Sequence, residues 1–340
     1  MSRQSKAFIC GCKGLSLEAQ ERAQIARHRP WGLILFKRNI KSPAQVAALV
    51  ASFREIVGRE DAPVLIDQEG GRVQRMGPPH WPAYPPAARF GQIAGGHAAQ
   101  VEAARLNARI MAADLRAVGI NVNCTPVLDV PAPGSHSIVG DRAYSADPLK
   151  VAALGLSVCL GMMEQGVLPV IKHIPGHGRA KADSHLELPR VSASRDELEQ
   201  VDFVPFQALA DMPLAMTAHV VYEAIDPDRP GTTSPRVVEE IIRGHIGFGG
   251  LLMSDDLSMK ALSGDFGERA RALFAAGVDM ALHCNGDWAE TEPVAMAAPE
   301  LTGESLKRAE RALALLKVAE QPLDLVDARA RIHLMLATTA

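Results

Sequence analysis

Short apolar runs recur along the chain, and most of them are continuously apolar instead of alternating with polar residues. Such runs are typical of strands buried on both faces of a parallel sheet, and their β-branched residues favour strand over helix. The eight runs are AFIC from Ala7, GLILF from Gly32, PVLI from Pro63, INVNC from Ile120, LPVIKH from Leu168, PLAMTAH from Pro213, LLMS from Leu251 and DMALHC from Asp279.

Segments with helical periodicity lie between these runs, for example SLEAQERAQIARH from Ser16 and SPAQVAALVASFREIVG from Ser42. Several begin at Ser or Asp, which cap helix N-termini, and end at Gly. Alternating strands and helices predict an α/β fold with a parallel sheet. Eight repeats without a Gly-x-Gly-x-x-Gly after the first strand favour a (β/α)8 TIM barrel over a doubly wound sheet.

No Pro/Gly/Ser-rich linker or block of charge divides the chain, so residues 1–340 are expected to form a single TIM-barrel domain. The helical pattern continues from about residue 302 in GESLKRAERALALLKVAE and DLVDARARIHLMLATTA. We expect these C-terminal helices to supply the last helix of the barrel and one terminal helix.

Charge and cysteine content narrow the class of protein. The formal charge is −3 with both signs interspersed, which disfavours nucleic acid or an anionic membrane as a partner. No apolar run is long enough to span a membrane, and the N-terminus lacks the apolar core of a signal peptide. The five cysteines form no regular framework, which suits a reducing compartment. We therefore expect a cytoplasmic protein.

Polar and charged residues end most of the apolar runs. In a TIM barrel the reacting groups lie at the carboxyl ends of the strands, so these residues are expected to meet at one rim. They occur in DQEGGRVQR (Asp67 to Arg75), PVLDV (Asp129), GDRAYSADP (Arg142), KHIPGHGRAKADSH (Lys172 to His185), TAH (His219), SDDLSM (Asp255 and Asp256) and HCNGD (Asn285).

Three kinds of chemistry fit such a rim. The first is metal-assisted hydrolysis, with a ligand set of His173, His177, Asp183, His185 and Asp255. Against it, Ile-Pro-Gly separates the first two histidines, and a lysine adjoins them. The second is carbohydrate binding without catalysis. The third is retaining glycoside hydrolysis, which needs a carboxylate nucleophile and a separate proton donor.

Two motifs supply the groups that retaining glycoside hydrolysis needs. In SDD, a carboxylate at a strand end can attack an anomeric carbon. In DSH, Asp183 can orient His185 as a carboxylate orients a catalytic imidazole, so that the histidine serves as acid and base.

Four motifs, KHIPGHGRAKADSH, DQEGGRVQR, GDRAYSADP and SDDLSM, resemble those of the family 3 glycoside hydrolases, and within them the bacterial cytoplasmic β-N-acetylglucosaminidases of peptidoglycan recycling. The likeness extends from WGLILFKRN near Trp31 to Asn285, which is most of the chain. The resemblance implies a single-domain barrel and a retaining mechanism.

The resemblance also implies the roles of individual residues. Asp255 would be the nucleophile, and His185 paired with Asp183 would be the acid/base. Asp256 would turn away to cap or pair, and His177 would have no chemical role. The N-acetylglucosamine would be held by Asp67, Arg75, Arg142, Lys172 and His173. Arg72 is expected to pair with an acidic neighbour such as Glu69.

The substrate implied is a β-linked N-acetylglucosamine at the non-reducing end of a muropeptide, joined to anhydro-N-acetylmuramic acid. No metal or organic cofactor is expected, and the protein is expected to be a monomer. Phosphorolysis stays open as an alternative, because a neutral histidine tolerates an incoming phosphate better than a carboxylate acid/base does.

Overall fold

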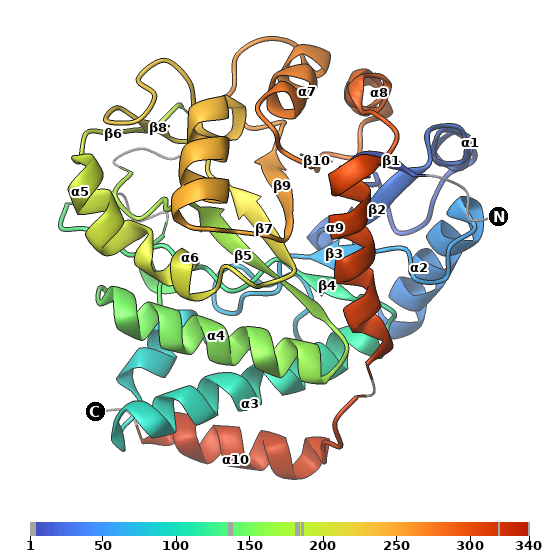
Figure 1. Ribbon diagram of the computed structural model, residues 1–340. Coiled ribbons are helices and arrows are strands. Elements are labelled where there is room, and N and C mark those ends of the chain that lie inside the picture. Colours follow the sequence, from blue (N-terminus) through green and yellow to red (C-terminus); the bar gives the residue numbers. More distant parts are fainter. Residues whose placement is uncertain (1–4, 135–138, 181–183, 185–186, 319, 339–340) are drawn as a thin grey trace.

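The eight predicted runs form the strands of one closed parallel barrel in a computed structural model, which describes residues 5–134, 139–180, 184, 187–318 and 320–338. Figure 1 shows the barrel with helices around it. The order around the barrel is β1, β10, β9, β7, β5, β4, β3, β2. Their bounds are β1 Lys6–Cys10, β2 Pro30–Leu35, β3 Val64–Ile66, β4 Val122–Asn123, β5 Leu168–Ile174, β7 Leu214–Thr217, β9 Leu251–Asp256 and β10 Met280–His283. The predicted TIM barrel is confirmed.

Helices follow the strands as the periodicity predicts. They are α1 Ala19–His28, α2 Pro43–Val57, α3 Gly96–Arg116, α4 Pro148–Glu164, α5 Arg195–Glu197, α6 Val204–Ala208, α7 Phe266–Ala275, α8 Trp288–Ala297, α9 Gly303–Ala314 and α10 Leu325–Ala337, with π-helical segments at Leu198–Asp202 and Val237–His245. Ser42, Asp147 and Asp265 accept hydrogen bonds from backbone N–H groups in the first turns of α2, α4 and α7. The expected caps therefore set where these helices begin.

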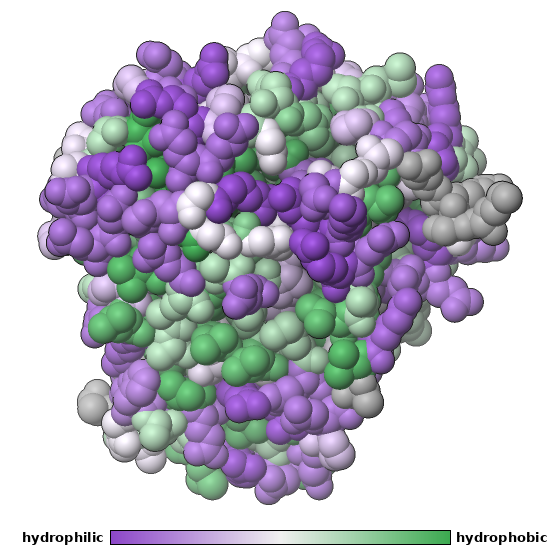
Figure 2. Space-filling model, viewed as in Figure 1, coloured by the Kyte–Doolittle hydropathy of each residue, from purple (hydrophilic) through white to green (hydrophobic). Residues whose placement is uncertain are grey.

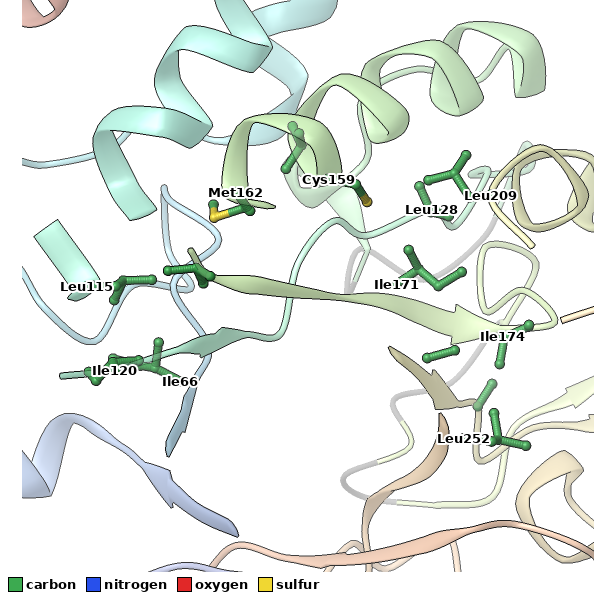
Figure 3. Close-up of a cluster of buried hydrophobic side chains, with 14 of the residues drawn as sticks. Ile66, Leu115, Ile120, Leu128, Cys159, Met162, Ile171, Ile174, Leu209 and Leu252 are labelled. Atoms are coloured by element: carbon green, nitrogen blue, oxygen red, sulfur yellow. The ribbon is translucent and has the colours of Figure 1, made fainter. Parts of the chain in front are cut away.

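Two apolar layers lie on either side of the barrel wall. Outward-facing strand residues pack against the helices, and Figure 3 shows Ile171 and Ile174 of β5 in the same cluster as Cys159 and Met162 of α4. Inward-facing residues of the strands fill the barrel together with Leu301 and with Ala309 and Ala312 of α9. The barrel interior is thus a packed core, and α9 covers part of it.

The expected role of the C-terminal helices needs one correction. The helix that follows the last strand is α8, which lies before residue 302, while α9 packs on the barrel interior and α10 packs beside α3 (Figure 1). Pro293 lies inside α8, and its apolar residues do not gather on one face, so the sequence pattern of this helix is weak.

One face of the molecule carries exposed apolar side chains among hydrophilic ones (Figure 2). Helix α4 carries three exposed leucines, Leu149, Leu156 and Leu160. A small parallel sheet of β6 (Arg190–Val191) and β8 (Val221–Tyr222) lies outside the barrel sheet. No helix in the described part of the chain combines the length and the hydropathy needed to cross a bilayer.

Candidate active site

A cavity of about 320 Å³ opens at the carboxyl ends of the barrel strands. This volume lies near the lower end of the range for small-molecule sites, which is about 300–1,000 Å³. Side chains from β2, β5, β7, β9 and β10 and from the loops between strands line it. The lining includes Asp67, Glu69, Arg72, Arg75, Arg142, Lys172, His173, His177, Ser184, Asp255 and Asp256, with Phe36, Val73, Val139, Met216 and Met259 among its apolar members. Much of the predicted rim therefore forms one pocket.

Asp67 lies between two cations at the end of β3. Its Oδ1 atom accepts a hydrogen bond from Lys172 Nζ at 3.0 Å, and its Oδ2 atom accepts one from Arg75 Nη2 at 2.9 Å. Burial raises the pKa of Asp67, but Lys172 and Arg75 outweigh it, so the pKa lies well below its ordinary value. Asp67 is therefore ionised at neutral pH and keeps both cations fixed.

Glu69 joins Lys172 to Arg142 in a second set of ion pairs. Its two oxygens each accept from Arg142 at 2.8 Å, and Oε1 also lies 2.6 Å from Lys172 Nζ. Burial raises the pKa of Glu69, but Lys172 and Arg142 lower it by more than burial raises it, so the pKa is about 2. Bidentate pairing of this kind fixes the direction of the guanidinium as well as its position.

Arg72 pairs with an acidic side chain, as expected, but that side chain is Asp141 and not Glu69. Arg72 Nε lies 3.3 Å from Oδ1 of Asp141, and both of these side chains are nearly half exposed. Of the two, Arg72 lines the cavity. Glu69 instead points inward to Arg142, which is 73 positions away in the sequence.

Asp129, at 0% exposed, supports His173 from beneath the cavity. Its Oδ2 atom lies 2.7 Å from His173 Nδ1, and its Oδ1 atom accepts from the backbone N–H groups of His173 and His177 at 3.2 and 2.7 Å. Burial raises the pKa of Asp129, but these partners bring it down to about 2. A carboxylate on Nδ1 directs the other ring nitrogen of His173 away from Asp129.

The loop after β5 can pass close to Asp129 because it contains Gly178. A Cβ atom at this position would lie 1.9 Å from the carbonyl oxygen of Val130, a distance that backbone atoms cannot accommodate. The N–H of Ala132 donates to the oxygen of Gly178 at 3.2 Å. The glycine thus allows the PGHG turn to pack against the segment that carries Asp129.

The two carboxylates at the end of β9 differ in how they are engaged. Asp256 Oδ1 accepts from the N–H groups of Ser258 and Cys284, each at 3.0 Å, and Oδ2 accepts from Ser258 Oγ at 2.5 Å. Asp255 accepts one hydrogen bond in the described structure, from Asp256 N at 2.8 Å. Asp256 accepts hydrogen bonds from neighbouring groups as expected, although it lines the cavity and does not turn away from it. Asp255 keeps an oxygen available to the cavity.

Burial raises the pKa of Asp255, but the nearby His173 and His219 imidazoles and the Lys172 cation lower it more, so the carboxyl is held below its ordinary pKa. It is therefore ionised at neutral pH. An ionised carboxylate at a rigid strand end is the state required of a nucleophile.

His177 is buried in the cavity wall at 4% exposed, and burial lowers its pKa to about 4. Its Nε2 atom lies 3.2 Å from Oγ of Ser184, which is also buried, while Nδ1 has no hydrogen-bond partner in the described structure. Asp183 and His185, the residues predicted as the acid/base pair, lie outside the described residues.

Some rim residues lie elsewhere than expected. Asn285 turns to Glu290, and His219 lies beneath the rim without lining the cavity. Glu69 and Asp129 were not in the predicted substrate-binding set. Asp129 directly follows the apolar residues Pro126 to Leu128, and Glu69 lies three residues after the run that ends at Ile66, but their partners are distant in sequence. Among the described residues, no group of three His, Cys, Asp or Glu side chains is arranged to hold a metal ion.

An enclosed set of fixed carboxylates and cations around one free carboxylate suits a small, hydroxyl-rich molecule, because each charged group can bond hydroxyl groups without reorganising. A barrel with such a site is typical of a glycoside hydrolase. The family model for the Glycosyl hydrolase family 3 N terminal domain matches residues 9–332.

Similar proteins agree with this match. The chain is 39% identical over 303 residues to a β-hexosaminidase of Aromatoleum aromaticum, covering 87% of this chain and 84% of that protein. The structure of NagZ from Neisseria gonorrhoeae in complex with N-trifluoroacetyl-D-glucosamine is 30% identical with a TM-score of 0.87, and the match covers 98% of each chain. The same protein in complex with zinc ion is 31% identical with a TM-score of 0.82, covering 99% of this chain and 97% of that one.

The chain belongs to glycosyl hydrolase family 3. Within that family it is a glycoside hydrolase of the β-hexosaminidase class.

Proposed function

We propose that this protein is a retaining exo-β-N-acetylglucosaminidase that removes non-reducing terminal N-acetylglucosamine from muropeptides. The observation that carries the proposal is the contrast between the two β9 carboxylates, with Asp256 fully engaged and Asp255 free at the cavity. The N-trifluoroacetyl-D-glucosamine complex of NagZ supports an N-acylated glucosamine as the sugar.

In the proposed first step, an Asp255 oxygen attacks C1 of the sugar. The bond from C1 to the leaving oxygen breaks, and that oxygen takes a proton from His185, which Asp183 orients. In the second step, His185 takes a proton from water, the water oxygen bonds to C1, and the bond from C1 to Asp255 breaks. Two displacements retain the β configuration.

Asp67, Arg75, Arg142, Lys172 and His173 are proposed to bind the hydroxyl and acetamido groups of the sugar. The three cationic partners of Asp67 and Glu69 are held before substrate arrives, so binding spends little free energy on ordering them. Apolar members of the wall, such as Met216 and Val139, offer contacts to the sugar's methyl group and ring carbons.

The finer substrate is proposed to be N-acetylglucosamine linked to anhydro-N-acetylmuramic acid, with or without its peptide, in cytoplasmic peptidoglycan recycling. The resemblance of the four motifs supports this assignment. One barrel domain spanning the chain is proposed to suffice for the activity, without a metal or organic cofactor.

The test is an assay for N-acetylglucosamine released from this disaccharide, run with Asp255→Ala as the control. We expect release by the wild type and loss of at least about 10³-fold in kcat in the variant. A sugar-phosphate product that appears only with inorganic phosphate would establish phosphorolysis. Loss of activity with a chelator and its recovery with zinc would establish metal-assisted hydrolysis. No release under any of these conditions would leave a sugar-binding protein.

The role of His185 is tested separately with His185→Ala. The variant is expected to cleave substrates with a good leaving group, such as an activated aryl glycoside, with less loss than substrates with a sugar leaving group, because only the latter needs a proton. Equal loss on both would contradict the acid role.

A further inference from the structure

The end of β9 that carries Asp255 departs from regular strand pairing. Met280 pairs with Met253, whereas Leu282 pairs with Asp256, so three steps along β9 face two steps along β10. On its other side, β9 pairs with β7 from Leu251 to Met253. An irregularity of this kind takes residues out of the ladder and re-aims their side chains, so other groups must hold the backbone there.

Groups on the β10 side hold one flank of the irregular segment. Ser254 Oγ accepts from the N–H of Leu282 at 3.0 Å, and the N–H of Leu257 donates to the Leu282 oxygen at 2.9 Å. The Asp256 carboxylate accepts from the N–H of Cys284 at 3.0 Å. Backbone and side-chain bonds together thus replace the regular ladder on this flank.

His219 holds the opposite flank, two residues beyond the end of β7. Its Nε2 atom lies 3.1 Å from the carbonyl oxygen of Asp256. A carbonyl oxygen only accepts, so Nε2 carries the hydrogen. The N–H of the same residue, Asp256, donates to the carboxylate of Asp255 at 2.8 Å. Residue 256 therefore connects the imidazole to the carboxylate.

Two threonines fix the imidazole in this tautomer. Thr232 Oγ1 lies 2.7 Å from His219 Nδ1 and 2.7 Å from Thr217 Oγ1. With Nε2 as the donor in a neutral ring, Nδ1 is an acceptor. Thr232 Oγ1 also lies 3.2 Å from the carbonyl oxygen of Ala218, so the shorter contact assigns its single hydrogen to Nδ1, and Thr232 in turn accepts from Thr217. His219, Thr232 and Thr217 are each 0% exposed, so water does not compete for these bonds. Burial also lowers the pKa of His219, which keeps the ring neutral.

We propose that His219 is a positioning residue for Asp255, which it aligns by holding the backbone of residue 256 through an Nε2 to carbonyl hydrogen bond. The proposal rests on the proposed role of Asp255 as the nucleophile. His219 does not line the cavity, so it aligns Asp255 through residue 256 and not by touching the substrate.

The experiment compares His219→Phe with His219→Gln. Phe keeps a ring but removes the donor, whereas the amide nitrogen of Gln can replace Nε2. The readout is the rate of covalent trapping by a fluorinated sugar, expressed per folded molecule. We expect Phe to slow trapping about 10- to 100-fold with KM changed less than about threefold, since small misplacement of a reacting atom costs about this much. We expect Gln to restore trapping to within about fivefold of wild type.

The matched control is His28→Phe. His28 is also buried, at 4% exposed, but it lies in α1 beside Trp288 and Glu292, away from the cavity. This variant is expected to lose stability without slowing trapping per folded molecule. If His219→Phe does not fold, Thr232→Val serves in its place, because it removes the hydroxyl that sets the tautomer of His219 and keeps the imidazole. We expect its trapping rate to be at least about threefold lower than that of the wild type.

A trapping rate equal to that of the wild type in His219→Phe would overturn the proposal. The same rate in Thr232→Val would do so when that is the variant that folds. Equal slowing by His219→Gln and His219→Phe would also overturn it. Asp255→Ala separates this failure from that of the proposed function. If Asp255→Ala is inactive while the His219 variants trap normally, the positioning role alone is wrong. If Asp255→Ala still turns over, the nucleophile assignment itself is wrong.

Discussion

The Nδ1 atom of His173 lies 2.7 Å from Oδ2 of Asp129, and this carboxylate also accepts the backbone N–H groups of His173 and His177. Asp129 thus fixes both the imidazole of His173, a residue predicted to bind the sugar, and the backbone turn that follows His173. The structure therefore gives Asp129, which lies outside the cavity lining, a direct influence on the sugar-binding set.

Asp129→Asn is expected to lower kcat/KM about 10- to 100-fold, because the amide removes a charged acceptor from His173 and presents an N–H to groups that donate. Steady-state kinetics on a chromogenic β-N-acetylglucosaminide measures this. Asp147→Asn, at the exposed N-cap of α4, is the control and should leave kcat/KM unchanged. Wild-type kinetics for Asp129→Asn would show that His173 needs no such support.

Glu69→Gln is expected to raise KM about tenfold or more, because the neutral amide no longer holds Arg142 and Lys172 together and leaves their buried charges poorly compensated. Substrate titration measures KM. The matched control is Glu55→Gln, whose side chain is 75% exposed and lies 3.7 Å from Arg22, since exposed ion pairs contribute little. Equal KM values for both variants would contradict the role given to Glu69.

Acid stability should depend on the carboxylates beneath the sugar site. Asp67, Glu69 and Asp129 all have pKa values below their ordinary ones, with Glu69 and Asp129 at about 2. A lowered pKa stabilises the folded state above the unfolded pKa of about 4, and that stability is lost as pH falls toward the folded value. The free energy of unfolding should therefore fall steeply from about pH 5 toward about pH 2.

Glu69→Gln provides the comparison for this pH dependence. The variant should be less stable than wild type near neutral pH, and the difference should shrink with acidification, because protonated Glu69 resembles glutamine. Denaturant titrations at several pH values measure this. A difference that stays constant down to about pH 2 would contradict the lowered pKa of Glu69.

Asp256→Asn should cost about 1–3 kcal/mol of stability, because its carboxylate accepts three hydrogen bonds and an amide oxygen cannot accept them all. The variant should still form a covalent adduct, although more slowly. Thermal unfolding and trapping measure the two effects. Loss of adduct formation in a folded Asp256→Asn protein would contradict the assignment of a supporting role.

Much of the barrel could be predicted because most of its strands lie in largely apolar runs of four to seven residues, and several of these runs end in polar residues. Lys172 and His173 illustrate this, since they end the run that forms β5. Residues at strand ends are brought together by the barrel whatever the loops do, so Asp67 and Asp255 could be placed at the same rim from the sequence.

Pairings between loops could not be predicted in the same way. Sequence proximity suggested that Arg72 pairs with Glu69. In the structure Arg142 pairs with Glu69, and Arg72 pairs with Asp141. The irregular end of β9 likewise depends on tertiary contacts, and no local pattern marks His219 as its support. Helix α8 was missed because Pro293 and scattered apolar residues conceal its periodicity.

The role of Asp255 as the nucleophile is best tested by trapping with a fluorinated N-acetylglucosamine analogue, followed by peptide mass spectrometry. We expect one covalent label, on Asp255, and none in Asp255→Ala. A label on Asp256 or on any other residue, or complete turnover without an adduct in the wild type, would contradict it.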